Sequence, residues 1–340
     1  MALACGAPFA LAVAAMTELL RVELLSCHFA QGDEYLAAVD GVSLSLAAGE
    51  VLGLVGESGS GKSTLGRLIA GLETPSSGDI YFAGQRLSRR RSGSALRAQG
   101  GDIQMVFQDS YASLNPRMTI AASLAEPLQQ RGCRGAALRS RVDEWLERVG
   151  LGQRFAGRYP HQLSGGQRQR VGIARAFITE PQLVICDEAV SALDVSVQAQ
   201  ILQLLREIQR DSATAMIFIT HDLAVLGSLA DRIAVMYLGE LLELAPCWQL
   251  LEQPLHPYTR QLLAAHPEPV LAPSPLAVVA RDQASELPTP LSSDMGCRFA
   301  GRCPYAQPEC LLQPPWLRRA TSGAAVACHR LDWLEAGASD

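Results

Sequence analysis

The chain has 340 residues, of which 48% are hydrophobic, and its formal net charge is −5 at pH 7. This length allows two or three domains with a substantial core and argues against a single compact sandwich. The acidic balance argues against a nucleic-acid partner, because a phosphate-binding face usually makes its domain basic. No stretch reaches the ~18 to 20 consecutive apolar residues of a spanning helix, so we expect no helix of this chain to cross a membrane.

The first 16 residues form an apolar extension that ends in Ala12-Val13-Ala14-Ala15. It is loosely like the apolar part of a secretory signal, but no Lys or Arg precedes the apolar run, as a signal peptide normally has. Met16 is a second candidate start, because a strand pattern begins directly after it. We therefore treat residues 1–16 as an extension, upstream of the true start if translation begins at Met16.

The pattern that follows predicts strands alternating with helices. Strands are expected at residues 20–29, 38–46, 51–55, 79–82, 103–108, 183–186, 215–220 and 232–238. Helices are expected at residues 65–70, 165–177 and 197–210, and a helical block from 109 to about 175 interrupts the core strands. Such alternation predicts an α/β fold with a mostly parallel sheet and right-handed crossovers.

Two further segments differ in composition from this core. Residues 87–97 are basic and polar and include Arg89-Arg90-Arg91, which we interpret as a solvated face. Beyond about residue 246 prolines become frequent, which predicts a loop-rich linker from His256 to about Asp294. A small cysteine-containing module follows. We thus expect a domain over residues 17–255 and a C-terminal extension over 256–340.

A phosphate-binding loop stands between a predicted strand and a predicted helix. The run Gly56-Glu57-Ser58-Gly59-Ser60-Gly61-Lys62-Ser63-Thr64 matches G-x-x-x-x-G-K-[ST] in full. Its glycines let successive backbone N–H groups turn toward phosphates, and the following helix adds the positive end of its dipole. We expect all nine residues to bind nucleotide, with Lys62 on the β- and γ-phosphates and Ser63 on Mg²⁺.

Two acids end a later apolar strand, Leu183-Val184-Ile185-Cys186. Ligands of open α/β sheets bind at the carboxyl ends of the strands, so we expect Asp187 and Glu188 beside the phosphate loop. Asp187 would hold Mg²⁺ through its water shell. Glu188 would polarise the attacking water, a general-base role worth typically ~10² to 10⁴ in rate.

The run Leu163-Ser164-Gly165-Gly166-Gln167 reads as a second anion site, because Ser and two glycines expose backbone N–H groups at a helix start. This run follows the predicted helical insertion, and in that position it resembles the signature of ATP-binding cassette (ABC) ATPases. The resemblance implies a RecA-like P-loop core with an N-terminal antiparallel β-subdomain and a helical subdomain. It also implies that the signature of one subunit closes over ATP held by another, so one cassette per chain implies a dimer.

Other residues match further landmarks of the ABC family. Gln108 matches the glutamine that senses Mg²⁺ and the attacking water, and His221 matches the histidine that contacts the γ-phosphate. Ser191-Ala192-Leu193-Asp194 matches the D-loop that contacts the partner subunit. The family also stacks an aromatic ring on adenine, for which Phe29 is our candidate and Tyr35 the alternative.

The tail narrows the resemblance. His256-Pro257-Tyr258-Thr259, with the run 107–117, is similar to the ATPase subunits of dipeptide, oligopeptide and nickel importers; Ser110 and Ala189-Val190 depart from that group's usual residues. The resemblance implies a second, usually sister, ATPase subunit, two transmembrane permeases, an extracytoplasmic solute-binding protein and a peripheral location on the cytoplasmic face of the inner membrane. Peptide is favoured as cargo and nickel is the alternative.

Nine cysteines in a chain with an ATP site indicate thiols or metal ligands, not disulfides. Four lie in the tail without any C-x-x-C pair, which gives little support to a zinc ribbon: Cys297, Cys303, Cys310 and Cys328. They suit either a 4Fe–4S cluster, which some members of this importer group carry on such a tail, or packing in a docking module, and His329 is a further candidate ligand. The others are interpreted as packing residues: Cys5, Cys27, Cys133, Cys186 and Cys247.

The predicted function is hydrolysis of ATP, with Mg²⁺, coupled to import. Three other functional classes are alternatives to this prediction. A non-transport ABC ATPase of DNA repair or translation would usually show two cassettes, a coiled-coil insertion or a basic face, and an exporter subunit would lack the His-Pro-Tyr-Thr tail. A redox or metal sensor built on the cysteines is compatible with transport.

Overall fold

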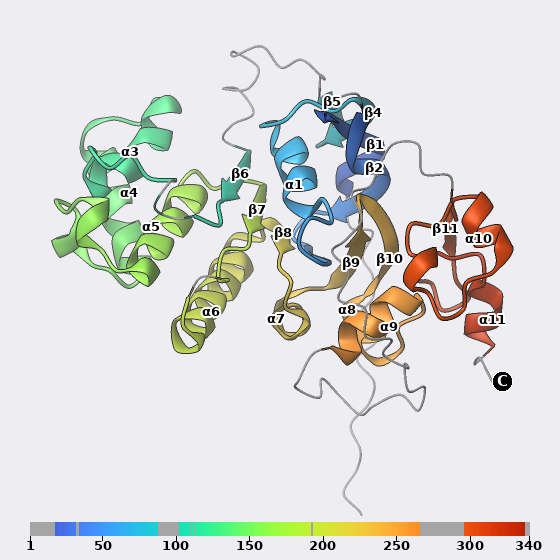
Figure 1. Cartoon of the computed structure of the whole chain (residues 1–340). Helices are drawn as coiled ribbons and strands as arrows, with labels where there is room; N and C mark the ends of the chain where they lie inside the picture. Colours follow the sequence, from blue (N-terminus) through green and yellow to red (C-terminus); the bar gives the residue numbers. More distant parts are fainter. Residues whose placement is uncertain are drawn as a thin grey trace, which may run out of the picture.

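Two β-sheets organise the protein (Figure 1). The computed structural model describes residues 18–31, 34–87, 102–109, 111, 113–191, 193–265 and 296–336; the N-terminal extension and nearly all of the basic segment 87–97 lie outside them. The first sheet is antiparallel, in the order β2-β1-β4-β5. Its strands are β1 (Glu18–Gln31), β2 (Glu34–Ala47), β4 (Ser77–Phe82) and β5 (Gln85–Leu87). The first two are longer than predicted, because they pair with each other along most of their length.

The second sheet has eight strands in the order β11-β12-β10-β9-β3-β8-β7-β6. Five are parallel and confirm the predicted core: β3 (Val51–Val55), β6 (Ile103–Val106), β7 (Leu183–Asp187), β8 (Ala215–Ile219) and β9 (Arg232–Tyr237). Three antiparallel strands extend one edge: β10 (Glu240–Pro246), β11 (Leu317–Arg319) and β12 (Ala325–Ala327). The sequence did not predict this extension.

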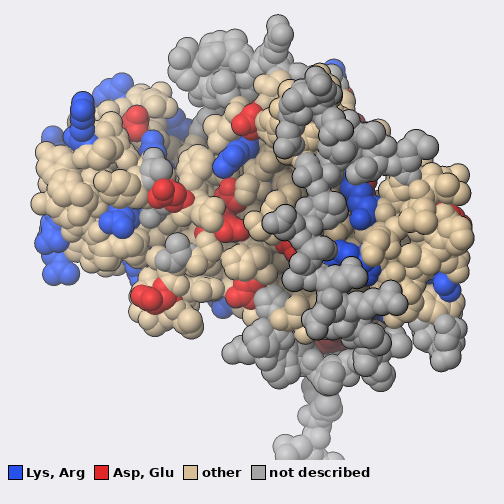
Figure 2. Space-filling view, viewed as in Figure 1, with Lys and Arg blue, Asp and Glu red and all other residues tan. Residues whose placement is uncertain are grey.

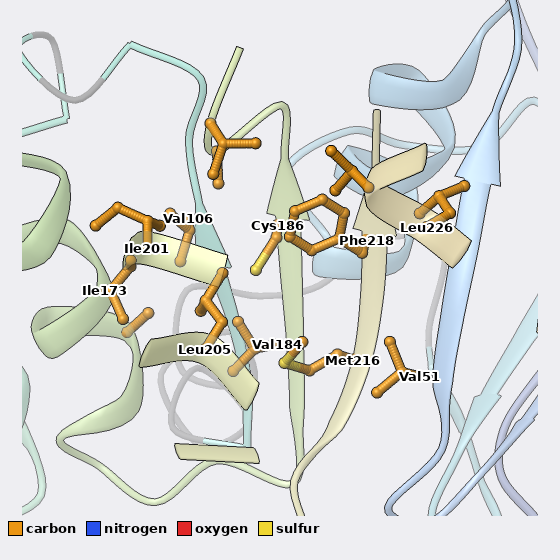
Figure 3. Close-up of a cluster of buried hydrophobic side chains, with 14 of the residues drawn as sticks. Val51, Val106, Ile173, Val184, Cys186, Ile201, Leu205, Met216, Phe218 and Leu226 are labelled. Atoms are coloured by element: carbon orange, nitrogen blue, oxygen red, sulfur yellow. The ribbon is translucent and has the colours of Figure 1, made fainter. Parts of the chain in front are cut away.

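Both faces of the parallel strands are buried, which explains their continuous apolar runs. In β7, Val184 and Cys186 belong to the core on one face, and Leu183 and Ile185 to the core on the other. Figure 3 shows the first core, where Cys186 of β7 lies beside Phe218 of β8. Successive residues thus supply two cores, as the period of two in a strand requires.

Helices cover the two faces (Figure 1). The antiparallel sheet and α1 (Lys62–Ala70) share one core with the main sheet. The opposite core includes residues of these helices: α5 (Gly165–Phe177), α6 (Val195–Ser212), α7 (Leu223–Leu229) and α8 (Cys247–Glu252). No helix in the described part of the chain has both the length and the apolar character needed to cross a bilayer.

The predicted helical subdomain is present. It contains α3 (Ile120–Gln130), α4 (Gly135–Arg148) and short 3₁₀ turns at Gln153–Phe155 and Pro160–Gln162, and it leads into α5. Trp145 is 1% exposed and stacks on Phe177 with ring centroids 6.4 Å apart. Figure 2 shows Lys and Arg side chains over the outer part of this subdomain, and Asp and Glu nearer the centre of the same face.

The C-terminal region corrects one prediction. The expected linker from His256 is wrong for residues 256–265, because His256 is buried and its Nδ1 accepts a 3.0 Å hydrogen bond from the Tyr258 N–H at the start of α9 (Pro257–Ala264). Proline at the first helical position suits this helix start. The remaining tail contains η3 (Ala300–Arg302), α10 (Pro308–Leu312) and α11 (Leu331–Glu335), and it joins the main sheet where β12 pairs with β10.

Candidate active site

The phosphate-binding loop connects β3 to α1, as predicted. Gly61 has φ +97°, and a Cβ there would lie 2.1 Å from the Ala38 carbonyl oxygen. Only glycine suits this backbone conformation and this close approach of β2. The helix therefore begins at Lys62 with its free N–H groups at the loop, which favours an anion there.

Lys62 lies inside the loop. Its Nζ donates hydrogen bonds to the Gly56 carbonyl at 2.8 Å, the Glu57 carbonyl at 2.7 Å and Ser60 Oγ at 3.1 Å. The side chain is buried, and burial lowers the pKa of the ammonium, while the nearby carboxylates of Glu188 and Asp187 act in the opposite sense. A positive charge held by loop carbonyls is positioned to bind phosphate oxygens that enter the loop.

Ser63 and Asp187 lie together, although 124 positions separate them. Ser63 Oγ donates a 2.7 Å hydrogen bond to Asp187 Oδ1. Asp187 is 3% exposed, and burial raises the pKa of its carboxyl, although the hydrogen bond from Ser63 lowers it. A hydroxyl and a carboxylate are hard oxygen ligands of the kind Mg²⁺ takes, so these two side chains fit the metal that the loop motif predicts.

Three predicted residues meet at the carboxyl ends of three neighbouring strands. Gln108 follows β6, Glu188 follows β7 and His221 follows β8. Gln108 Nε2 donates a 2.8 Å hydrogen bond to Glu188 Oε2, and His221 Nδ1 lies 3.7 Å from Glu188 Oε1. Glu188 has φ +45°, an unusual conformation for a residue other than glycine, and its N–H donates to the Ile219 carbonyl at 3.0 Å. Glutamate is thus held at the strand end, between an amide and an imidazole.

The signature run forms the start of α5. Ser164 Oγ accepts a 3.3 Å hydrogen bond from the Gln167 N–H, and Gln167 Oε1 accepts a 3.0 Å hydrogen bond from the Ser164 N–H, which is a capping box. A Cβ on Gly166 would lie 2.7 Å from Val197 Cγ1 of α6. The signature therefore packs against the segment that follows the D-loop. Leu163 anchors the run in the core; Ala192 of the D-loop lies outside the described residues.

Comparison with known proteins agrees with this geometry. Residues 39–191 match the family model described as ABC transporter, and residues 242–310 match the one described as oligopeptide/dipeptide transporter, C-terminal region. The oligopeptide transport ATP-binding protein AppF of Bacillus subtilis is 47% identical over 86% of this chain and 89% of its own length. The chain belongs to the ABC transporter ATP-binding proteins. OppF of Escherichia coli, also named an oligopeptide transport ATP-binding protein, is 46% identical over 90% and 91%.

Solved structures of ABC cassettes have the same fold as this ABC protein. A dimeric ATP-binding cassette in a post-hydrolysis state with ADP and Pi has a TM-score of 0.63 and 30% identity, and it covers 67% of this chain and 99% of its own. The fold is therefore that of a P-loop ABC ATPase, which binds ATP with Mg²⁺ and hydrolyses it.

The adenine-stacking candidates of this ABC protein lie near the tip of the β1–β2 hairpin. Phe29 is 39% exposed and Tyr35 is 57% exposed, and their neighbours pair across the hairpin. Exposure leaves both rings available for stacking. The choice of Phe29 over Tyr35 stays a prediction.

The four tail cysteines line one small cavity, together with His256, Phe299 and His329. All four are free thiols. Burial raises the pKa of Cys297 to about 12 and that of Cys303 to about 11. The described residues nevertheless contain no group of three or more His, Cys, Asp or Glu arranged closely enough to hold a metal ion.

The other described cysteines agree with the packing interpretation. Cys27, Cys186 and Cys247 are buried, and Cys133 is partly buried and packs against the core; Cys5 lies outside the described residues. Burial raises the pKa of Cys186 to about 12. A thiol in such an environment stays protonated and unreactive.

Two contacts at the phosphate loop were missed by sequence reasoning. The Glu57 N–H donates a 3.0 Å hydrogen bond to the hydroxyl of Tyr258, and Arg302 forms two hydrogen bonds with the Glu57 carboxylate. The partners lie 201 and 245 positions apart, so no local pattern predicts them. In the sequence, the His-Pro-Tyr-Thr run served only to indicate the family. The hydrogen bond from the Glu57 N–H to the Tyr258 hydroxyl shows that the tyrosine of this run also contacts the phosphate loop.

Proposed function

We propose that this protein is the ATP-hydrolysing subunit of an ABC importer of di- and oligopeptides, peripheral on the cytoplasmic face of the membrane. The observation that supports the hydrolytic site best is the meeting of Gln108, Glu188 and His221 at the strand ends beside the phosphate loop. Peptide as cargo rests on the C-terminal region match and on the names of AppF and OppF. Nickel, the alternative cargo, has no such support among these relatives.

In the proposed mechanism, the loop binds the phosphates of ATP and Lys62 places its positive charge on the β- and γ-phosphates. Ser63 and Asp187 would hold Mg²⁺, which would supply positive charge to neutralise the charge on the phosphoryl group. Glu188 accepts a hydrogen bond from the attacking water and orients it. Gln108 orients the Glu188 carboxylate through its 2.8 Å hydrogen bond to Oε2. His221 lies with its Nδ1 3.7 Å from the other carboxylate oxygen, Oε1, where the imidazole can reach the γ-phosphate. Catalysis is then positioning and charge stabilisation.

The proposed assembly is a pair of cassettes on two permeases that receive cargo from an extracytoplasmic binding protein. Ser164 and Gln167 cap the start of α5, and Ser164 is exposed there, so the signature can meet the ATP of a second subunit. Structures of dimeric cassettes similar to this chain support the pairing. We propose a sister subunit as the partner; a homodimer would give ATP-dependent dimerisation of the purified chain alone.

The mechanism is tested by Glu188→Gln, with Glu207→Gln on the exposed face of α6 as the matched control. The variant is expected to bind ATP with wild-type affinity and to lose hydrolysis by about 10² or more, because the amide cannot act as a base. The control should hydrolyse ATP normally. Hydrolysis by Glu188→Gln at a near wild-type rate would remove Glu188 from its proposed role.

The cargo is tested in cells that lack the chain and in cells that regain it. Uptake of a labelled tripeptide should return only with the wild-type chain, and not with Glu188→Gln. Uptake of labelled Ni²⁺ should be the same in all three strains. Restored nickel uptake without restored peptide uptake would reject peptide as the cargo.

We propose a 4Fe–4S cluster as the occupant of the four-cysteine cavity, with packing as the competing role. Four thiols on one cavity are the donor set that such a cluster takes. Against this stands the spacing of the described side chains, which does not bring three ligands together. Because burial raises the pKa of Cys297 to about 12 and that of Cys303 to about 11, cluster binding would release protons from these two thiols. It would also have to draw the cysteines closer together.

Anaerobic purification with iron and sulfide analysis separates the two roles. A cluster predicts brown protein with about four irons per chain, lost when the cysteines are changed to serine. The control changes Cys133, which lies in the loop before α4 and is not one of the cavity cysteines, to serine. Colourless, iron-free wild-type protein would leave the cysteines as packing residues.

A further inference from the structure

Glu57 lies at the junction between the C-terminal region and the phosphate loop. Its carboxylate accepts two hydrogen bonds from Arg302, at 2.9 and 3.0 Å, and its N–H donates to the Tyr258 hydroxyl at 3.0 Å. Its carbonyl oxygen accepts a 2.7 Å hydrogen bond from Lys62 Nζ. All three polar groups of one loop residue are therefore occupied, two by the C-terminal region and one by the lysine that meets phosphate.

The two C-terminal groups are themselves fixed by packing. The rings of Tyr237, Tyr258 and Phe299 are each at most 1% exposed and contact one another with centroids 4.7 to 5.5 Å apart. The guanidinium of Arg302 lies over the Tyr237 ring at 5.6 Å and the Phe299 ring at 5.8 Å. Because Arg–carboxylate pairs with two parallel bonds also fix orientation, Arg302 holds Glu57 in one direction.

A second set of contacts connects the tail segment 297–303 to Ser60 of the phosphate loop. The side chain of Arg298 is 4% exposed; it donates to the Leu238 carbonyl and pairs with Asp40. Gly239, which follows Leu238 in the chain, donates a 3.0 Å hydrogen bond from its N–H to the Ser60 carbonyl. Arg298 therefore supports the turn between β9 and β10 on which Ser60 rests.

We infer that the C-terminal region positions the phosphate loop through Arg302 and Tyr258, which act on Lys62 by way of Glu57. These are positioning residues, since neither contacts the reacting atoms. The segment 297–303 places both arginines next to cysteines of the tail cavity, because Arg298 follows Cys297 and Arg302 precedes Cys303. The inference rests on the ATP site proposed above, and it concerns nucleotide affinity, which is measurable whatever the cargo or the cavity's occupant.

The test measures the affinity of the purified full-length chain for a fluorescent ATP analogue with Mg²⁺, at a temperature where circular dichroism shows each variant folded. Arg302→Ala is expected to weaken binding about 5- to 20-fold, because the loop must then order itself on binding. KM for ATP should rise by a similar factor with a smaller change in kcat, since the loop holds phosphate before and during the reaction. Arg302→Lys, which keeps charge without the fork, should recover part of the loss.

Tyr258→Phe is the second variant, because it removes only the hydroxyl and keeps the ring packing. It should weaken ATP binding in the same sense. The matched control is Arg148→Ala: Arg148 pairs with Asp211 and lies 4.9 Å over the Trp145 ring, and its side chain is 27% exposed, against 30% for Arg302. The control should leave ATP affinity unchanged.

A double-mutant cycle decides whether the effect passes through Glu57. In a Glu57→Gln background, Arg302→Ala should cause little further loss of affinity, because its partner charge is already gone. Wild-type affinity in both folded Arg302→Ala and Tyr258→Phe would overturn the inference. Equal losses from Arg302→Ala with and without Glu57→Gln would overturn it too, by showing that Arg302 acts elsewhere.

Discussion

The hydroxyl of Ser63, in the first turn of α1, donates a 2.7 Å hydrogen bond to Asp187 Oδ1 at the end of β7. The bond spans 124 positions of sequence and joins the phosphate loop to the acidic strand end. Both proposed magnesium ligands are thus oriented by each other. Such orientation lowers the cost of assembling a metal site.

Asp187→Asn tests this pair. Burial raises the pKa of Asp187, which means that its charge is unfavourable in the folded protein, so the neutral amide should not lower the melting temperature without nucleotide. The Mg²⁺ concentration that gives half-maximal ATPase activity should rise by roughly 10-fold or more, because a ligand charge is lost. Asp211→Asn, at an exposed carboxylate paired with Arg148, is the control. An unchanged magnesium requirement would argue against Asp187 as a ligand.

Gly61→Ala is expected to disrupt the loop. The new Cβ would lie 2.1 Å from the Ala38 carbonyl oxygen, so the backbone must move. Gly59→Ala is the control, since Gly59 also has positive φ, at +78°, but a Cβ there meets nothing within 4 Å among the described residues. Gly61→Ala should cost more than ~1 kcal/mol beyond the control in thermal unfolding without nucleotide. Equal costs would mean that backbone conformation alone matters.

His256 should make stability depend on pH. Burial lowers its pKa from 6.5 to about 3, so above pH 6.5 the folded and unfolded chains both hold it neutral. As pH falls from 6.5 toward 3, only the unfolded chain gains the proton, and about 2 kcal/mol of stability should be lost between pH 7.5 and pH 5. Arg260 acts in the same sense on His256, whereas buried Glu243, whose pKa is raised by burial, titrates in the opposite one.

The measurement compares urea unfolding of the wild type and His256→Asn at both pH values. Asparagine keeps an oxygen that can cap α9 but does not titrate, and Glu243 is present in both proteins. The stability gap between the two proteins should shrink by about 2 kcal/mol on going to pH 5. The same pH dependence in both proteins would contradict a buried neutral histidine.

Trp145 should be a major support of the helical subdomain. It is 1% exposed, packs on Phe177 and lies under the guanidinium groups of Arg141 and Arg148. Trp145→Ala should cost about 3 to 5 kcal/mol through lost contacts and a cavity. Trp145→Phe should cost clearly less, because Trp145 Nε1 has no hydrogen-bond partner among the described residues. Similar losses for both variants in urea unfolding would mean that the cavity is not the cause.

The sequence by itself determined the local parts of this protein. The strand, glycine loop and helix around Lys62 follow one another in one continuous run of sequence. The apolar strands that end at Asp187 and Ile219, alternating with helices, predicted a parallel sheet. Since ligand sites of such sheets lie at the carboxyl ends, Asp187 and Glu188 were expected beside the phosphate loop, and the family resemblance added Gln108 and His221. The structure brings Gln108, Glu188 and His221 together. The places of these residues could be predicted because hydrophobic periodicity and motif spacing are local features of the sequence, whereas their roles in catalysis stay predictions.

Only the tertiary structure decided how the C-terminal region joins the site. β11 and β12 have three residues each, too few to show a strand period. Only the tertiary structure shows that β12 pairs with β10 and that β11 pairs with β12. His256 lies in a proline-rich stretch that suggests a linker, yet its burial depends on Phe299, 43 positions later. The contacts of Glu57 with Tyr258 and Arg302 likewise join segments more than 200 positions apart, whose meeting is governed by packing and not by any local pattern.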